Sequence, residues 1–136
     1  MADAGSGALR LVRSFADTLG AGADVDLLGT REEAAAWLHT AELLPAEAGL
    51  TNSEHAALLR LREAVRDVLA AQADGREDPA AAARLTRALA EGRLVVTVGP
   101  ASAVRLVSAA RSSFPSVVAA IAVAIADSAA AGTWPA

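Results

Sequence analysis

The stretch from Ser112 to Ala126 constrains the fold most, because its 15 residues carry no charge and most are alanine, valine or isoleucine. A helix that spans a bilayer needs about 18 or more apolar residues, so this stretch is too short to cross a membrane. Its small side chains suit a buried helix that other helices can approach closely. We therefore expect a helix from about Pro115 to about Ala131 at the centre of the fold.

Helix-start signals divide the chain before that stretch. Thr30 and Thr51 each stand three residues before a glutamate, which is the spacing of a capping box. Asp78 precedes Pro79, an N-cap followed by proline at the first helical position. With an apolar stripe near the N-terminus, these signals predict helices over about 9–19, 31–41, 53–73 and 79–91. Residues 1–7 are small and polar, and we expect them to be disordered.

The apolar period changes after Gly92. The β-branched run from Arg93 to Val98, a turn over Gly99–Ser102 and a second run from Ala103 to Ser108 predict a β-hairpin. A lone hairpin is marginally stable in water, so we expect it to pack on helices. Together these elements predict a mainly α fold with a small β-hairpin (α+β), its helices packed around the alanine-, valine- and isoleucine-rich C-terminal helix.

Composition excludes several kinds of site. The chain has no cysteine, so it forms neither disulfides nor cysteine-ligated metal sites. Its net charge is -4 and its 12 basic residues, all arginine, are spread along the sequence, whereas nucleic-acid binding needs a basic face. The N-terminus lacks the positive segment and apolar run of a secretory signal, so we expect a cytoplasmic protein with no membrane partner.

The sequence shows no catalytic motif. His39 and His55 stand near helix ends, where structural roles are expected, and their spacing indicates no metal site. No histidine stands at triad spacing from the serines of the C-terminal third, which are Ser108, Ser112, Ser113 and Ser116. We expect neither an enzyme nor a metal or other cofactor in this segment.

Two polar clusters leave alternatives open. Asp17 and Thr18 can form a locally hydrogen-bonded helix end, or they can line a pocket. Glu63 with Arg62 and Arg66 can form a solvated surface pair, whereas a buried version of the cluster could bind a carboxylate or phosphate. Spacing favours the local, solvated interpretation of both clusters.

The order of these segments resembles the ABATE domain, the N-terminal domain of the CGNR zinc-finger proteins, a bacterial family of stress-induced transcription regulators. The resemblance extends from Leu9 over nearly the whole chain. It is carried by Leu9-Arg10-Leu11, Phe15-Ala16-Asp17-Thr18, Asp26-Leu27-Leu28, Trp37-Leu38, Leu61-Arg62-Glu63-Ala64-Val65-Arg66, the Leu94–Val98 strand and the Ile121–Ala131 segment. One departure is Asp17, which stands where the family tends to have asparagine.

The resemblance implies a domain over residues 8–132, with residues 133–136 starting a linker to a C-terminal zinc ribbon that carries a Cys-Gly-Asn-Arg signature. That ribbon is absent from this chain. The resemblance implies that zinc is bound only there and that DNA is contacted only through it. This sequence would then be a truncated part of the regulator.

We interpret the segment as a regulatory, ligand-sensing domain that takes a small molecule between its helices. The predicted ligand-binding residues are Phe15, Asp17, Thr18, Trp37, Arg62 and Arg66. Asp17 and the arginines would orient a polar ligand, and the two aromatic rings would wall it. The alternative is a helical module that forms a homodimer without a ligand. A cavity of roughly 300 Å3 or more with convergent polar groups would favour sensing, and a flat apolar helix face would favour dimerisation.

Overall fold

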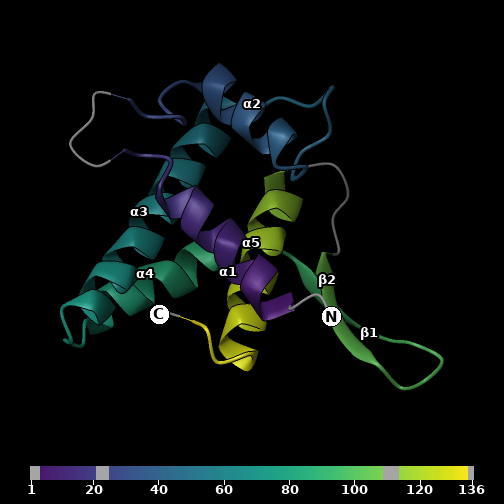
Figure 1. Cartoon of the computed structure of the whole chain (residues 1–136). Coiled ribbons are helices and arrows are strands. Elements are labelled where there is room, and N and C mark those ends of the chain that lie inside the picture. Colours follow the sequence, from purple (N-terminus) through teal and green to yellow (C-terminus); the bar gives the residue numbers. More distant parts are fainter. Residues whose placement is uncertain (1–3, 21–24, 109–113, 135–136) are drawn as a thin grey trace.

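The computed structural model describes residues 4–20, 25–108 and 114–134, which form five helices and one hairpin (Figure 1). In chain order the elements are α1 (Ala4–Ala16), α2 (Arg31–Thr40), α3 (Asn52–Ala73), α4 (Pro79–Leu89), β1 (Leu94–Val98), β2 (Val104–Ser108) and α5 (Phe114–Ala130).

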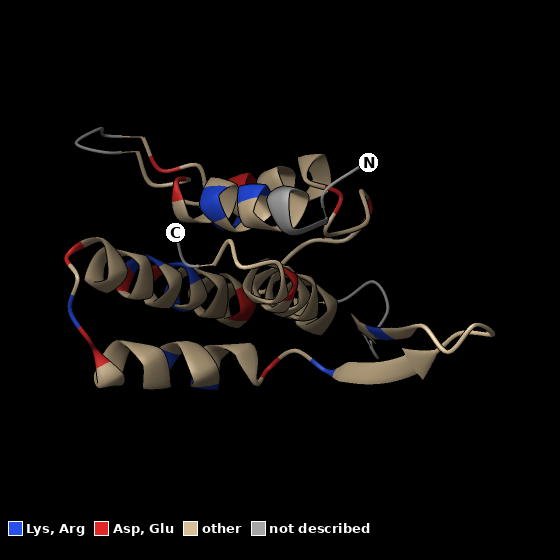
Figure 2. Cartoon of the chain, turned by 60° about the horizontal axis from the view of Figure 1, so that its bottom comes forward, with Lys and Arg blue, Asp and Glu red and all other residues tan. Residues whose placement is uncertain are grey.

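The elements lie in three layers (Figure 2). The middle layer contains α3 and α5, with α1 and α2 on one side and α4 and the hairpin on the other. α5 packs along α1, against α4 and against β2. The fold prediction is thus confirmed: the protein is mainly α with a small hairpin, built around the C-terminal helix. In the described part of the chain, no helix is long and apolar enough to cross a membrane.

The predicted apolar stripes meet in one core. α1, α2, α3 and α5 each contribute side chains to it that are almost fully buried, because each helix presents apolar residues at a spacing of three or four. The largest of these side chains belong to Val12, Phe15, Leu38, Leu58, Leu61, Val65, Val117, Val118 and Ile121.

The three helix-start signals are confirmed. The Thr30 and Thr51 side chains accept from backbone N–H groups three residues on, and the glutamate at that position accepts from the threonine N–H in turn. The Asp78 carboxylate accepts from the Ala81 N–H at 3.0 Å, with Pro79 opening α4.

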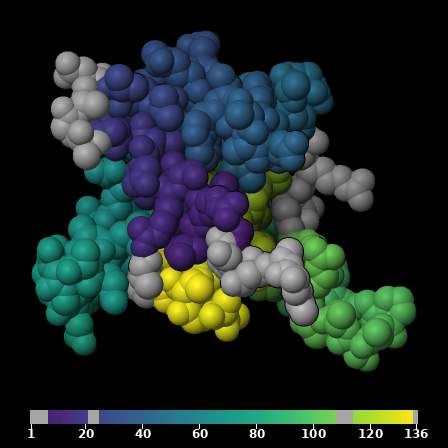
Figure 3. Space-filling model, viewed as in Figure 1, coloured from purple at the N-terminus to yellow at the C-terminus, as the bar shows by residue number. Residues whose placement is uncertain are grey.

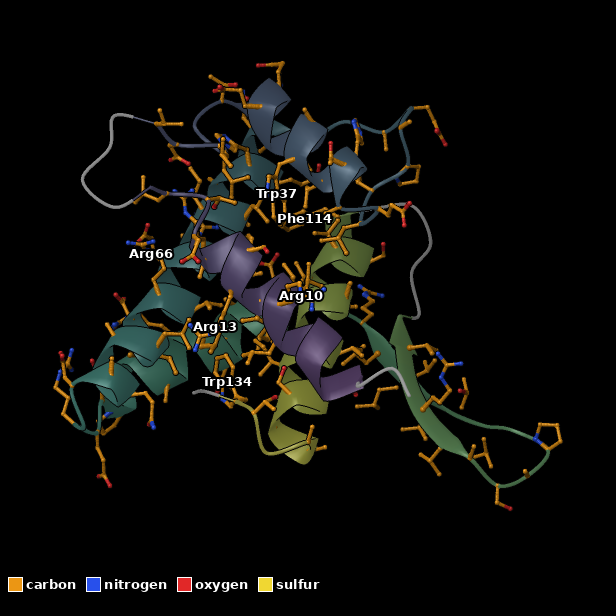
Figure 4. All side chains as sticks on the ribbon, viewed as in Figure 1. Arg10, Arg13, Trp37, Arg66, Phe114 and Trp134 are labelled. Carbon is orange, nitrogen blue, oxygen red and sulfur yellow. The ribbon has the colours of Figure 1, made fainter. Side chains whose placement is uncertain are left out.

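Both ends of the chain differ from the prediction. α1 begins at Ala4, inside the segment expected to be disordered, because it packs along α5; residues 1–3 lie outside the described residues. After α5 the chain turns at Gly132, whose φ is +76°. The Thr133 and Trp134 N–H groups then donate to the Ser128 carbonyl. Trp134 packs back against the core (Figure 4), so the described start of the expected linker lies on the domain.

The hairpin is confirmed, but helices cover it only in part. Its register pairs Val96 with Leu106 and Val98 with Val104. β2 contacts α5 at its base, yet the hairpin projects from the helical body (Figure 3). The expected packing on helices is therefore limited to the contact of β2 with α5, and several valines and leucines of the hairpin are exposed.

Candidate functional site

Two arginines of α3 hold the segment that follows α1. Arg62 and Arg66 lie about one helical turn apart, so both reach the same neighbour. The two terminal nitrogens of Arg62 donate to the two carboxylate oxygens of Asp26, at 2.5 and 2.9 Å. One of them also donates to the Thr18 hydroxyl at 3.2 Å. This bidentate pair is the strongest geometry open to a guanidinium and a carboxylate.

Arg66 completes the same arrangement. Its Nη1 donates to the carbonyls of Ala16, at 2.8 Å, and of Leu19, at 3.3 Å. The last carbonyls of a helix lack partners within the helix, and Arg66 supplies one at the end of α1 (Figure 4). We call Arg62, Arg66, Thr18 and Asp26 the arginine clamp.

The clamp binds two segments that are already paired with each other. Leu19 and Asp26 form an isolated antiparallel bridge, and the Leu27 N–H donates to the Thr18 carbonyl at 2.9 Å. The Asp26 carboxylate also accepts from the Leu28 N–H at 2.9 Å. The hydrogen bonds from Arg62 lower the pKa of Asp26; burial opposes them, and the Leu28 N–H lowers it further. Asp26 is therefore ionised at neutral pH, as the clamp requires.

The structure brings together some of the predicted ligand-binding residues. Thr18 lies against Arg62, and the rings of Phe15 and Trp37 lie 6.0 Å apart at an interplanar angle of 44°. Phe15 is fully buried in the core, and Trp37 is half-buried beside it. Asp17 is exposed, and the carboxylate that pairs with Arg62 is that of Asp26.

The two open alternatives have different outcomes. The local interpretation of Thr18 is confirmed, because its hydroxyl donates to the Phe15 carbonyl at 2.7 Å. The solvated interpretation of the arginine cluster is wrong: the Arg62 side chain is only 4% exposed, and the carboxylate it binds belongs to this chain. Ligand binding at the six residues stays a prediction, and a ligand carboxylate would have to replace that of Asp26.

Asp26 is the functional residue that the sequence analysis missed. Its partner lies 36 residues away in the sequence, so no local spacing connects the two. The available signal was its place in the Asp26-Leu27-Leu28 motif, one of the segments that carry the family resemblance.

The two histidines have structural roles, as predicted. Nε2 of His39 lies 2.7 Å from the Ala48 carbonyl, and Nε2 of His55 lies 2.7 Å from the Leu28 carbonyl. Because a carbonyl oxygen only accepts, each Nε2 is the donor. Within residues 4–20, 25–108 and 114–134, no three His, Cys, Asp or Glu side chains gather as metal ligands would.

A groove of about 560 Å3 runs between α3 and α4. Leucine and alanine side chains line it together with arginines and carboxylates, and Arg84 reaches across to Asp67 at 3.3 Å. Its lining residues are Leu59, Arg60, Glu63, Ala64, Asp67, Arg84, Arg87, Ala88 and Glu91. Glu63 connects this groove to the clamp, since its Oε1 lies 3.8 Å from Nε of the buried Arg62.

The fold and these contacts define a small helical domain in which one long helix carries a clamp and borders a groove. Over residues 5–132 the chain matches the ABATE family, described as "Putative stress-induced transcription regulator". Because the match covers nearly the whole chain, the protein belongs to this family, which confirms the resemblance drawn from the motifs. No curated protein and no solved structure matches the chain.

Proposed function

We propose that this chain is the ligand-sensing regulatory domain of a bacterial, cytoplasmic transcription regulator and has no enzymatic activity of its own. The observation that carries the proposal is the groove between α3 and α4. Its volume of about 560 Å3 lies within the range of small-molecule sites, which is roughly 300–1,000 Å3. Polar groups of both signs converge on it, as sensing requires.

The lining of the groove favours one class of ligand. Leu59, Ala64 and Ala88 offer apolar surface, while arginine and carboxylate side chains stand beside them. The apolar part of a ligand would cover the leucine and alanine side chains. An anionic and a cationic group on the same ligand would pair with the arginine and carboxylate side chains. We therefore propose a small amphipathic zwitterion as the ligand.

Glu63 offers a route from the groove to the clamp. A ligand cation that attracts the Glu63 carboxylate would draw it from Arg62, whose Nε lies 3.8 Å from Oε1 of Glu63 and has no hydrogen-bond partner among the described residues. The position of Arg62 governs Asp26 and so the loop after α1. Binding in the groove would thus change the stability of a segment on the opposite side of α3.

A thermal-shift screen tests the groove. We expect free apolar amino acids, or larger zwitterions of that type, to raise the melting temperature, since a ligand at 100 times its Kd adds about 2.7 kcal/mol to the stability of the folded state. Ala88→Trp fills the groove and should abolish the shift, whereas Ala83→Trp, exposed on α4 outside the groove, should retain it.

Glu63→Gln serves as a second variant that leaves the shape of the groove unchanged. Its side chain is half exposed, so the fold should tolerate the change, while the ligand-induced shift should fall. If no zwitterion stabilises the chain, or if Ala88→Trp leaves the shift intact, the groove is not the sensing site.

The DNA contact is proposed to lie outside this chain, in a zinc ribbon after residue 136. The net charge of -4 supports this division, because a DNA-binding face must neutralise phosphates. We expect the 136-residue chain to show no electrophoretic shift of duplex DNA at physiological salt. The coding sequence downstream should contain a Cys-Gly-Asn-Arg segment, and a stop codon directly after residue 136 would contradict the proposal.

The predicted alternative was dimerisation through a flat apolar helix face. The large hydrophobic side chains that the described residues expose are instead mostly on the hairpin. A dimer would therefore form through that element, away from the groove, rather than through a helix face.

A further inference from the structure

The hairpin separates its side chains into an apolar and a mixed face. Successive residues of a strand point to opposite faces, and directly paired residues point to the same face. The register places Ser108 and five aliphatic residues on one face, which we call the apolar hairpin face. The aliphatic residues are Leu94, Val96, Val98, Val104 and Leu106. Arg105, the charged residue of the two strands, belongs to the other face with Thr97.

The apolar hairpin face is open to solvent. Its aliphatic side chains are between 37% and 68% exposed, the most open being Val104 and Val98 near the turn. On the mixed face Val95 is 44% exposed, whereas its partner Val107 is half-buried, where β2 meets α5. The exposed face carries roughly 400–500 Å2 of apolar surface, which is the size of the largest patch on a typical monomer, and such patches are often functional.

An uncovered hairpin of this kind is unfavourable for an isolated chain. Two strands alone are marginally stable in water, and covering one face with apolar contacts is the usual remedy. Of the six strand positions of this face, five are valine or leucine and the sixth, paired with Leu94, is Ser108, so the face carries no charged residue. The pattern indicates a face that is covered in the working state of the protein.

A second copy of this chain fits the face best. The face is uncharged, so a two-fold axis that brings it against itself buries no charge and leaves both Arg105 side chains on the outer surfaces. Two such faces bury about 800–1,000 Å2 in total, which is the size of a weak, reversible interface. The hairpin also projects from the body (Figure 3), which keeps apart the helical bodies of two chains that each have a net charge of -4.

We propose that two copies of this chain dimerise by packing their apolar hairpin faces against each other. The two hairpins then form a small sandwich with the sheets about 10 Å apart, and neither the groove nor the clamp takes part. The inference does not depend on the proposed ligand site.

Sedimentation velocity over a concentration series tests this proposal. The wild-type chain should sediment as a species of twice the 13.7 kDa chain mass at tens of micromolar. Val96→Lys places a charge at the centre of the interface and should weaken the dimer by at least about tenfold. Thr97→Lys adds the same charge to the neighbouring residue on the mixed face and should leave the dimer intact.

Val96→Thr is a control for the possibility that Val96→Lys weakens the dimer by unfolding the hairpin. It keeps the β-branched shape that suits a strand, and it should weaken the dimer less than the lysine does, with an unchanged circular dichroism spectrum. A wild-type monomer at about 100 µM, or equal effects of the two lysine variants, would overturn the proposal; a monomer would leave the face to a different partner.

Discussion

Asp26→Ala is expected to lower the free energy of unfolding by about 3 kcal/mol, because it leaves a buried guanidinium without its carboxylate. The Arg62 side chain is 4% exposed and donates to both oxygens of Asp26. The Leu28 N–H loses an acceptor as well. Urea unfolding of the variant measures the change, and Asp17→Asn, at an exposed acid near the same loop, should change stability by less than about 0.5 kcal/mol.

Replacing the arginine of the pair instead of the aspartate should have a smaller effect on stability. Arg62→Met fills a similar volume and leaves Asp26, which is 28% exposed, able to bind water and the Leu28 N–H. We expect a loss of about 1–2 kcal/mol for Arg62→Met. The double variant that combines Asp26→Ala with Arg62→Met should be more stable than Asp26→Ala alone, since it removes the unpaired charge of the buried Arg62. If both single variants lose the same amount, burial of Arg62 is not the cause.

The pH dependence follows from the same pair. The pKa of Asp26 is lower in the folded chain than its ordinary value of 3.8, so the ionised pair contributes stability above that value. The contribution is lost as the pH falls through the lower, folded pKa. The stability difference between the wild type and Asp26→Asn should therefore be constant from pH 7 to about pH 5 and shrink below about pH 4.

Gly92→Ala is the second substitution with a large expected effect. A Cβ at Gly92 would lie 2.7 Å from the backbone nitrogen of Ala119, 2.9 Å from its Cα and 3.0 Å from the carbonyl carbon of Val118. All three atoms belong to the backbone of α5, which cannot rotate away as a side chain can. We expect a loss of about 2–3 kcal/mol in urea unfolding, the range of overpacked cores.

Two controls separate the close approach at Gly92 from a general effect of glycine replacement. Gly49→Ala meets no atom within 4 Å and should be neutral or stabilise the chain by up to about 1 kcal/mol. Adding Ala119→Gly to Gly92→Ala should not restore stability, because the clash is with backbone atoms rather than with the Ala119 methyl group. A variant Gly92→Ala as stable as the wild type would show that the helix can shift.

The local elements were predictable because their determinants lie close together in the chain. Each capping box joins residues three apart, so Thr30 and Thr51 predict the starts of α2 and α3 independently of the tertiary contacts. The β-branched run around Thr97 likewise predicts a strand. Where tertiary contacts intervened, boundaries moved: α1 starts earlier because it packs along α5, and it ends earlier because the Thr18 hydroxyl bonds to Phe15.

The candidate site was predictable only in part. The sequence indicated Thr18 and Arg62 as members of one site, and they do meet. The predicted acidic residue of the site was Asp17 rather than Asp26, because no sequence pattern shows which residue between two helices comes to lie against a third helix. The groove went unpredicted for a similar reason, since its two walls come from separate helices.

The sequence by itself determined the helices and the hairpin, because hydrogen bonds and apolar periodicity within a few residues encode them. The family followed from the order of its motifs along the chain. Only the tertiary structure decided that Asp26 pairs with Arg62, that Gly92 lies against the backbone of α5, and that the hairpin exposes an apolar face. These outcomes depend on the packing of elements far apart in the chain. Burial of the whole core sets that packing, and no short segment carries it.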